Sequence, residues 1–308
     1  MLQAAAAAAG SQHYPAPALY LVATPIGNLA DLTLRAIHVL ALVDAVACED
    51  TRHTASLLRH LGLDKPLLAL HQHNEHGAAQ AVLQRLARGE RVAYVSDAGT
   101  PAVSDPGAVL VAAAQAAGHT CLPIPGASSA LAALSVAGDT QPGGFRFVGF
   151  LPARGAERQA ALQAVAEASE AQVLFEAPHR IEALVRQLAD SGPARRVTLC
   201  RELTKQFETV STMAASDLPA WLAADPNRQR GEFVLVVHGR PAGADADEMA
   251  DERLLTTLLR ELPLKQAVAL AAEIGGSPRN ALYQRALALK AAGDTAAAEA
   301  SPDPASGP

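Results

Sequence analysis

Short apolar runs alternate with longer amphipathic segments in the first part of the chain, starting near residue 18. The runs are almost continuously apolar, which is typical of strands buried on both faces of a parallel sheet. The segments between them repeat apolar positions at helical spacing. We predict strands at residues 19–23, 45–48, 67–70, 92–95 and 120–123, and helices at residues 32–42, 54–61, 78–88 and 108–117. The pattern predicts an N-terminal α/β domain over residues 18–126.

A second series of strands and helices follows a helix of small residues that starts after Gly126. Strands are predicted at residues 145–150, 172–176, 197–202 and 231–238, with helices at residues 157–169 and 180–189. This series predicts a second α/β domain over residues 127–240. The fold class is therefore α/β.

Helical spacing returns near the C-terminus, after residues 241–247, whose Pro, Gly, Ala and Asp content is typical of a linker. A small helical hairpin module is predicted over residues 248–292. Gly275 and Gly276 separate its last two helices. Ser277 directly follows the two glycines and is the predicted N-cap of the last helix. The predicted helices of this module are residues 251–261, 264–274 and 278–289.

Both ends of the chain are biased in composition. Residues 1–17 are rich in Ala with two Pro, and residues 293–308 consist largely of Ala, Ser, Pro and Asp. Segments of this kind bury little apolar surface. Both are predicted to be disordered tails.

Composition and charge narrow the classes of function. No apolar run reaches the roughly 18 residues that a membrane span needs, and the start of the chain lacks a basic leader region, so a cytoplasmic protein is expected. Cys48, Cys121 and Cys200 are far apart in sequence, which argues against a disulfide framework or a thiolate zinc site. The net charge is −6, but seven of the 25 Lys and Arg residues precede Arg146 and 18 lie from it onward. Any basic surface for nucleic acid is therefore expected in the second half.

A long loop, S-D-A-G-T-P-A-V-S-D-P-G at residues 96–107, directly follows a predicted strand. Most loops between a strand and a helix need two to six residues. Gly and Pro fix its backbone shape in advance, and its two Asp residues supply hydrogen-bond acceptors. Ligands of open α/β sheets bind at such strand ends, so we interpret this loop as a binding loop rather than a plain turn.

Four more polar loops are predicted at strand ends and can converge with it on one cleft between the two domains. They are T-P-I-G-N-L at residues 24–29, E-D-T-R-H at 49–53, P-G-A-S-S at 125–129 and E-A-P-H-R at 176–180. The chain has no G-x-G-x-x-G, P-loop, H-E-x-x-H or G-x-S-x-G motif. His71, His73 and His76 form a cluster without a suitably spaced fourth ligand, so no metal is predicted.

These motifs together resemble the tetrapyrrole methylase family, and within it a subfamily that 2′-O-methylates a cytidine of 16S ribosomal RNA. The resemblance covers residues 19–289. E-L-T-K at residues 202–205, G-E-F-V-L-V-V at 231–237 and the closing S-P-R-N-A-L-Y add to it. It implies two α/β domains with S-adenosylmethionine in the cleft between them, a small C-terminal helical module and a homodimer that acts on the small ribosomal subunit.

The resemblance also implies which residues hold the cofactor. The loop at residues 96–107 would line its methionine and ribose side. The loops at residues 24–29 and 125–129 would form the opposite walls. The residues so implied are Pro25, Gly27, Asn28, Asp97, Ala98, Gly99, Pro101, Val103, Ser104, Ser128 and Ser129.

Methyl transfer to a ribose hydroxyl needs alignment above all, and a base near the hydroxyl helps. Glu49 and Asp50 are candidates for this base, and the alternative for them is a helix N-cap with an ion pair to Arg52. The residues expected at RNA are Arg52, His53, Arg154, His179, Arg180, Arg201, Lys205, Arg279 and Arg285.

Two other functions and one other structural role stay open on the sequence. A small-molecule methylase of the same fold would not need the C-terminal hairpin. A non-catalytic RNA-binding or ribosome-assembly factor would not bind S-adenosylmethionine. The C-terminal hairpin can equally be a helical cap packed on the second domain.

Overall fold

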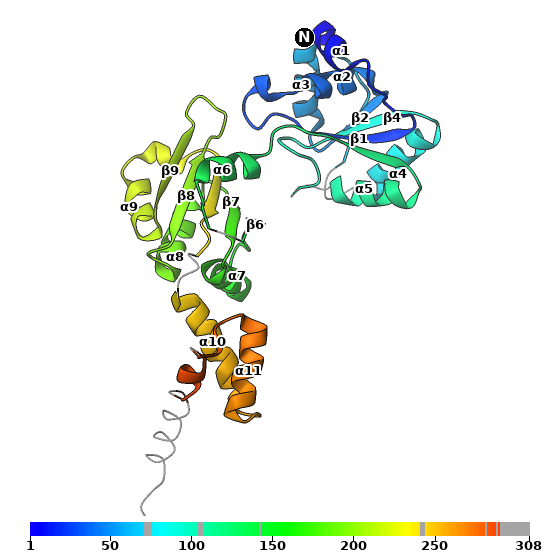
Figure 1. Ribbon diagram of the computed structural model, residues 1–308. Helices are drawn as coiled ribbons and strands as arrows, with labels where there is room; N and C mark the ends of the chain where they lie inside the picture. The colour runs from blue at the N-terminus through cyan, green and yellow to red at the C-terminus, as the bar shows by residue number, and fades with distance from the viewer. Residues whose placement is uncertain are drawn as a thin grey trace, which may run out of the picture. The chain divides into compact units, whose positions relative to one another are not determined.

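The computed structural model describes residues 1–70, 75–103, 107–141, 143–240, 244–280, 282–287 and 289. The chain divides into two units, residues 1–239 and residues 240–308 (Figure 1). The first unit holds two five-stranded sheets, and the second holds helices.

The first sheet is parallel throughout and has the strand order β3-β2-β4-β1-β5. Its strands are β1 (Ala18–Val22), β2 (Ala45–Cys48), β3 (Leu67–Ala69), β4 (Arg91–Val95) and β5 (Thr120–Ile124). The helices are α2 (Leu34–Leu42), α3 (Thr51–Leu61), α4 (Glu75–Ala87) and α5 (Gly107–Ala116), with a 3₁₀ turn at Leu29–Asp31. The predicted α/β alternation of this region is confirmed.

Alternate strand residues point to opposite faces of this sheet. Tyr20 and Val95 pack with α2 and α3 on one face, whereas Leu19 and Tyr94 pack with α4 and α5 on the other. Because β4 lies between β1 and β2 but is followed by a helix on the opposite face, the connections diverge at the carboxyl ends of these strands. Open α/β sheets bind ligands at such a divergence.

The second sheet is mixed, with the order β6-β7-β10-β8-β9 and one parallel pair, β6 with β7. Its strands are β6 (Phe145–Phe150), β7 (Ala171–Glu176), β8 (Arg196–Arg201), β9 (Thr209–Ala214) and β10 (Phe233–Val237). Helix α6 (Ser129–Ala137) packs on one face. The other face carries α7 (Gly155–Glu167), α8 (Ile181–Ser191) and α9 (Leu218–Ala223), with 3₁₀ turns at Ala215–Asp217 and Pro226–Gln229.

Strand β9 and helix α9 lie outside the elements that the sequence predicted. β9 is an edge strand whose residues are half-buried or exposed, so it lacks the continuous apolar run of its neighbours. Helix α9 has only six residues, too few to show a helical period.

The prediction of a disordered tail over residues 1–17 was wrong. Helix α1 (Leu2–Ala9) packs against α2, and Ala5 and Ala9 are buried there. The Tyr14 hydroxyl donates to the Ala9 carbonyl oxygen at 3.0 Å, and the Arg91 side chain donates to the carbonyl oxygen of Tyr14. Alanine has the highest helix propensity and its small side chain allows close helix packing, which a composition argument does not capture.

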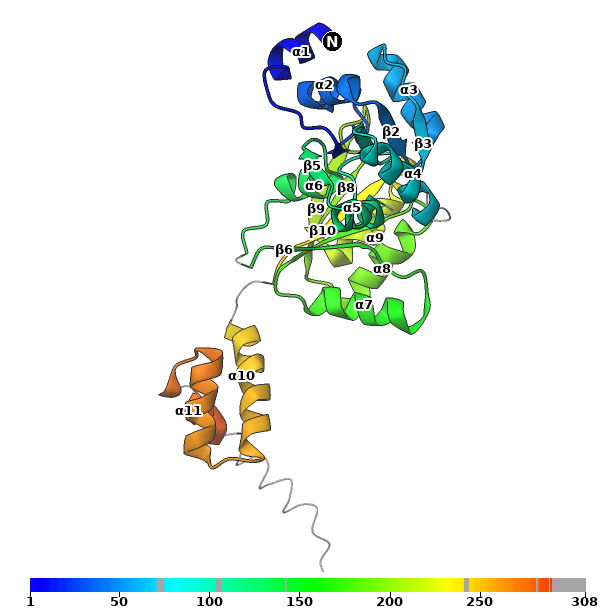
Figure 2. The same ribbon diagram turned by 90° about the vertical axis from the view of Figure 1, so that its right-hand side faces the viewer.

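The second unit contains α10 (Ala244–Leu259) and α11 (Leu264–Gly275), which lie side by side in both views (Figure 2). Leu255, Val268, Ala271, Leu282 and Ala286 form its core. Helix α10 begins inside the predicted linker 241–247, so the linker is shorter than predicted. The predicted tail at residues 293–308 and part of the last predicted helix lie outside the described residues.

In the described part of the chain, no helix is both long enough and apolar enough to cross a membrane. The same residues contain no group of three or more His, Cys, Asp or Glu placed to hold a metal ion. His71 and His73 of the histidine cluster lie outside the described residues, as does the side chain of His76.

Candidate functional site

Two loops of the first sheet are joined by their main chains. Thr24, after β1, and Gly99, after β4, exchange N–H···O bonds of 2.9 and 3.1 Å, and the Thr24 hydroxyl donates to the Ser96 carbonyl oxygen. Gly99 has a φ of +84°, and a Cβ there would lie 3.3 Å from Cγ2 of Ile26. Residues with a side chain rarely adopt this backbone conformation, so position 99 needs glycine.

The loop after β5 is attached to the same structure. The Thr100 hydroxyl donates to the Ala127 carbonyl oxygen at 3.0 Å. A Cβ on Gly126 would come within 2.9 Å of Cβ of Ala23. The loops after β1, β4 and β5 therefore form one wall, whose shape is set by backbone contacts; we call it the glycine wall.

The loop after β2 is held to this wall by Asp97, whose Oδ1 accepts the Asp50 N–H at 3.0 Å. Asp50 is the N-cap of α3, and its carboxylate accepts the Arg52 N–H at 2.8 Å and pairs with the Arg52 guanidinium. The pKa of Asp50 is held well below its usual range, mainly by the hydrogen bonds from the Arg52 side chain and also by the one from the Arg52 N–H. A carboxylate of this kind is a weak base, so the geometry favours the N-cap interpretation for Asp50.

The second sheet contributes a loop with strained backbone at residues 202–205. Glu202 and Thr204 have φ values of +53° and +65°. The Glu202 side chain fills the space beside Gly231, where a Cβ would lie 2.5 Å from its Cγ. Thr204 Oγ1 is buried without a hydrogen-bond partner among the described residues. Strain and unsatisfied polar atoms of this kind cluster at functional sites.

Lys205 is held between two carboxylates. Its Nζ lies 2.9 Å from Glu202 Oε1 and 3.2 Å from Glu232 Oε2. Burial lowers the pKa of Lys205, but the hydrogen bonds to Glu202 and Glu232 outweigh this and raise it. For Glu202 the directions are opposite. Burial raises its pKa, but the hydrogen bonds from Lys205 and from the Glu232 N–H outweigh burial and lower it. We call residues 202–205 with 231–232 the charged wall.

The two walls touch at Gly27. A Cβ on Gly27 would lie 2.4 Å from Cγ of Lys205 and 3.0 Å from Oγ1 of Thr204. Only a residue without a side chain permits this approach. The contact makes the glycine wall and the charged wall opposite sides of one cleft.

Two adjoining cavities lie in this cleft. The smaller, of about 400 Å³, has mixed polarity, and the charged and polar side chains on it include those of His53, His60 and Lys205. The larger, of about 490 Å³, is lined by aromatic and aliphatic side chains that include Phe150 and Phe175. The cavities share Ile26, Asp97, Ala98 and Glu232.

The structure brings many of the predicted residues to these cavities. Pro25, Gly27, His53, Asp97, Ala98 and Lys205 line the smaller one, and Asp97, Ala98, Val103 and Ser129 line the larger one. Ser128 lines a neighbouring hollow, and Asn28 caps the 3₁₀ turn that follows it. Gly99 and Pro101 shape the wall without lining either cavity, and Ser104 lies outside the described residues.

Other predicted residues lie elsewhere. Glu49 and Asp50 do not line either cavity. Arg52 and His179 are exposed. Arg201 donates to the carbonyl oxygens of Arg230 and Phe207, which leaves it a structural role. Arg154 and Arg180 line a separate groove, and Arg279 and Arg285 belong to the second unit.

Among the lining residues, the sequence analysis did not single out His60, Phe150, Phe175 and Glu232, and it named Glu176 only as the start of the loop at residues 176–180. Their only signal is position, because the phenylalanines and glutamates lie at strand ends and His60 lies two helical turns after His53 on α3. Glu176 is fully buried, and its Oε2 has no hydrogen-bond partner among the described residues.

The chain is similar to known proteins over most of its length. Residues 18–219 match the family model "Tetrapyrrole (Corrin/Porphyrin) Methylases", and residues 244–290 match "RsmI C-terminal HTH domain". The chain is 49% identical to ribosomal RNA small subunit methyltransferase I of Pseudomonas aeruginosa over 87% of its own length and 96% of that protein's. It is 47% identical to the protein of the same name from Escherichia coli O157:H7, over 87% and 94%. The chain belongs to the ribosomal RNA small subunit methyltransferase I family.

Three solved structures share the fold of this chain. The methyltransferase CobJ matches with a TM-score of 0.55 at 21% identity, covering 73% of this chain and 97% of its own. Diphthine synthase matches with 0.55 at 16% identity, over 71% and 89%. Uroporphyrin-III C-methyltransferase from Thermus thermophilus, complexed with S-adenosylhomocysteine, matches with 0.51 at 16% identity, over 71% and 96%.

Proposed function

We propose that this protein transfers a methyl group from S-adenosylmethionine to the 2′-hydroxyl of a cytidine ribose in 16S ribosomal RNA. The observation that carries the proposal is the pair of adjoining cavities that share Asp97 and Ala98. One is lined by aromatic and aliphatic side chains and the other has mixed polarity, so donor and acceptor can lie side by side. The names of the relatives support ribosomal RNA as the substrate.

The larger cavity has the chemistry to hold the cofactor. Phe150 and Phe175, whose rings are 5.7 Å apart and edge to face, offer apolar surface to a planar base. Oε2 of Glu176 is buried and has no hydrogen-bond partner among the described residues, so it can accept a hydrogen bond from an amino group. S-adenosylmethionine supplies a methyl group on a positively charged sulfur. The cofactor residues are proposed to be those implied by the resemblance, together with Phe150, Phe175 and Glu176.

The smaller cavity is proposed to take the ribose of the target nucleotide. Lys205 and His53 line it and can bind an adjacent phosphate, and the rigid glycine wall excludes water behind the reacting atoms. In-line displacement depends mainly on alignment, which two fixed walls supply. For proton removal we keep Glu49 as the candidate base and assign Asp50 to the N-cap of α3. Arg52, His179, Arg279 and Arg285 are proposed RNA contacts outside the cleft, and Arg201 is a support of the charged wall.

Finer points belong to the same proposal. Two α/β domains meet at residue 126, two copies form a homodimer, and the protein acts in the cytoplasm on the small ribosomal subunit. Light scattering coupled to size-exclusion chromatography measures the mass of the assembly. A monomer at micromolar concentration contradicts the homodimer.

The test uses 30S subunits from cells that lack this modification, incubated with the protein and methyl-labelled S-adenosylmethionine. Digestion of the 16S RNA to nucleosides is expected to give labelled 2′-O-methylcytidine. Label on a base contradicts the acceptor. Absence of label together with no calorimetric heat for S-adenosylmethionine favours a non-catalytic RNA-binding protein.

A further inference from the structure

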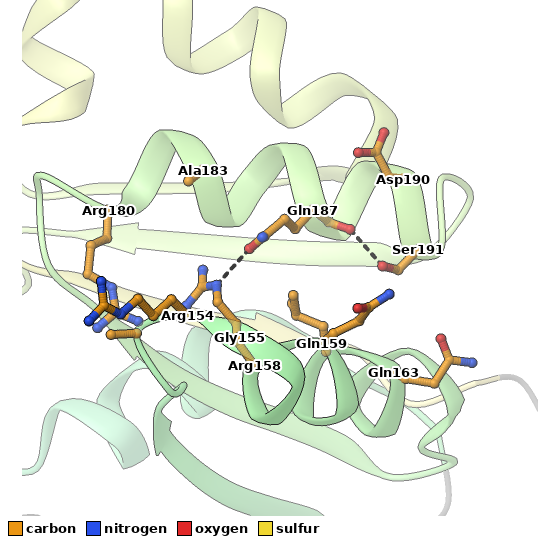
Figure 3. A pocket seen from close by; sticks show the side chains of 12 residues that line it. Arg154, Gly155, Arg158, Gln159, Gln163, Arg180, Ala183, Gln187, Asp190 and Ser191 are labelled. Carbon is orange, nitrogen blue, oxygen red and sulfur yellow. Dashed lines mark hydrogen bonds between the residues drawn. The ribbon is translucent and has the colours of Figure 1, made fainter.

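A groove of about 540 Å³ runs between α7 and α8 on the second sheet (Figure 3). None of its lining residues lines either cavity of the cleft. Arg154, Arg158 and Arg180 lie near the N-terminal ends of both helices, and the rest of the groove offers amide and hydroxyl side chains. The groove is therefore a separate polar site on the same unit.

Two of its arginines are fixed in place. Arg158, only 8% exposed, donates to Gln187 Oε1 at 2.9 Å and to the Pro152 carbonyl oxygen at 3.0 Å. Arg180 donates to the Leu151 carbonyl oxygen at 2.7 Å and pairs with Glu176 at 3.0 Å. Donors fixed in this way lose little conformational entropy when they bind a ligand.

The charge at this end of the groove is not balanced. Among the described residues, Glu176 is the carboxylate paired with Arg158 and Arg180, and Arg154 is exposed with no hydrogen bond or ion pair. Three guanidinium groups thus face one carboxylate. Asp190 lies at the opposite end of the groove (Figure 3). The first turns of α7 and α8 have no side-chain cap, so their N–H groups add to the positive field. The acidic residues of these turns, Glu157 and Glu182, do not line the groove.

We propose that this groove binds the sugar–phosphate backbone of the RNA substrate, with a phosphate at Arg154 and the fixed arginines beside it. The planar guanidinium matches phosphate oxygens in two-point contacts. Gln159 and Ser191 offer donors and acceptors suited to ribose hydroxyls. This inference rests on the proposed function for the identity of the RNA.

Glu176 connects the groove to the cleft. Its side chain lines the larger cavity, and its carboxylate holds Arg158 and Arg180 of the groove. A phosphate in the groove is therefore one side chain away from the cavity assigned to the cofactor. RNA bound in the groove is held next to the cleft, on the side of the larger cavity.

The test compares Arg154→Gln with Arg88→Gln, which removes an exposed guanidinium just before β4, at the opposite end of that strand from the cleft. Filter binding of 16S RNA transcribed in vitro is measured over a series of salt concentrations. Arg154→Gln is expected to weaken binding about tenfold at low salt and to reduce the slope of log affinity against log salt by about one. Its KM for RNA rises by the same factor, whereas calorimetric affinity for S-adenosylmethionine stays at the wild-type value.

Gln159→Glu is a second variant that keeps every arginine and places a carboxylate in the groove. It is expected to weaken RNA binding in the same direction. The groove proposal is overturned when both variants bind RNA as Arg88→Gln does, or when polyglutamate competes as strongly as unlabelled RNA. If Arg154→Gln weakens RNA binding as expected but the wild-type protein transfers no methyl group, only the proposed function is contradicted.

Discussion

The two walls of the cleft are built in different ways. The glycine wall uses main-chain hydrogen bonds, such as the pair between Thr24 and Gly99, and close backbone contacts such as Gly126 on Ala23. The charged wall uses side chains, with Lys205 between Glu202 and Glu232 on a loop that has left-handed non-glycine residues. A main-chain wall has one shape, and a charged wall has a field that depends on every member. This contrast supports the proposal that the glycine wall holds a cofactor of constant shape.

The largest effect is expected from Lys205→Met. The change leaves Glu202 and Glu232 without their cation and removes the positive charge from the smaller cavity. We expect kcat/KM for methyl transfer to fall about 100-fold, because the cation that lines the acceptor cavity is lost and two carboxylates are left without it. Radiometric assay of methyl transfer to 30S subunits measures it. Lys65→Met, which removes an ammonium bonded to the Ala41 and Val43 carbonyl oxygens, is the control. Equal loss in both variants contradicts a special role for the charged wall.

The glycine wall is tested by Gly99→Ala. An alanine at φ +84° with its Cβ 3.3 Å from Ile26 costs about 1–2 kcal/mol of local strain and moves the loop. Affinity for S-adenosylmethionine is expected to fall about tenfold, because each 1.4 kcal/mol is tenfold in affinity. Calorimetric titration gives the constant.

Gly62→Ala is the matched control for this change. Gly62 has a similar φ of +74° but nothing within 4 Å of the added Cβ, so the variant bears the backbone cost alone. It is expected to lower stability slightly and to leave cofactor affinity unchanged. If Gly62→Ala weakens the cofactor as much as Gly99→Ala does, the glycine wall has no particular shape to protect.

The charged wall also predicts a dependence of stability on pH. The folded pKa of Glu202 is lowered, so its contribution is present above the unfolded value of about 4.3 and is lost as the pH falls through the folded value. The folded pKa of Lys205 is raised, so its contribution is complete below about 10.4 and is lost only as the pH rises through the folded value. Stability from this pair should be flat between about pH 5 and pH 10.

Urea unfolding across this range, with Glu202→Gln beside the wild type, measures the effect. The loss of stability on the acid side is expected to become shallower in Glu202→Gln. Glu182→Gln, which removes an exposed partner of Arg186, should leave the acid side unchanged. If stability falls as steeply on the acid side in Glu202→Gln as in the wild type, the ion pair between Glu202 and Lys205 does not stabilise the charged wall.

The smallest effect is expected from Asp50→Asn. Asparagine caps a helix as well as aspartate does, and Asp50 is assigned to the cap rather than to proton transfer. Methyl transfer should stay within about threefold of wild type, whereas loss of a general base costs 10²–10⁴-fold. A loss of 100-fold or more makes Asp50 the base and contradicts the assignment. Glu49→Gln is the companion variant for the remaining candidate.

Much of the fold could be predicted because buried parallel strands are apolar throughout. β2 at Ala45–Cys48 and β6 at Phe145–Phe150 coincide with the predicted ranges. The same argument explains the misses. β9 is an edge strand without a continuous apolar run. α1 is an alanine helix, and its packing against α2 is seen only in the structure.

The candidate site divides in the same way. Asp97, Gly99 and Lys205 stand in segments whose Gly, Pro and charge content marks them in the sequence. Glu176 begins a loop that the sequence placed at the cleft, but a glutamate at the end of an apolar strand gives no sign that it will be fully buried between two arginines. Arg154 and Arg180 were predicted to contact RNA, but their meeting in one groove between α7 and α8 was not predicted, since they are 26 residues apart in sequence.

The sequence by itself determined the local features of this protein: which segments become strands, which loops need glycine, and which family the motifs resemble. Those features depend on hydrophobic period and on backbone conformation, which neighbouring residues set. Only the tertiary structure decided which charges meet. Lys205 against Gly27, and Glu176 against Arg158 and Arg180, are contacts between distant segments. Such contacts depend on strand order and helix packing, and no local pattern encodes those distances.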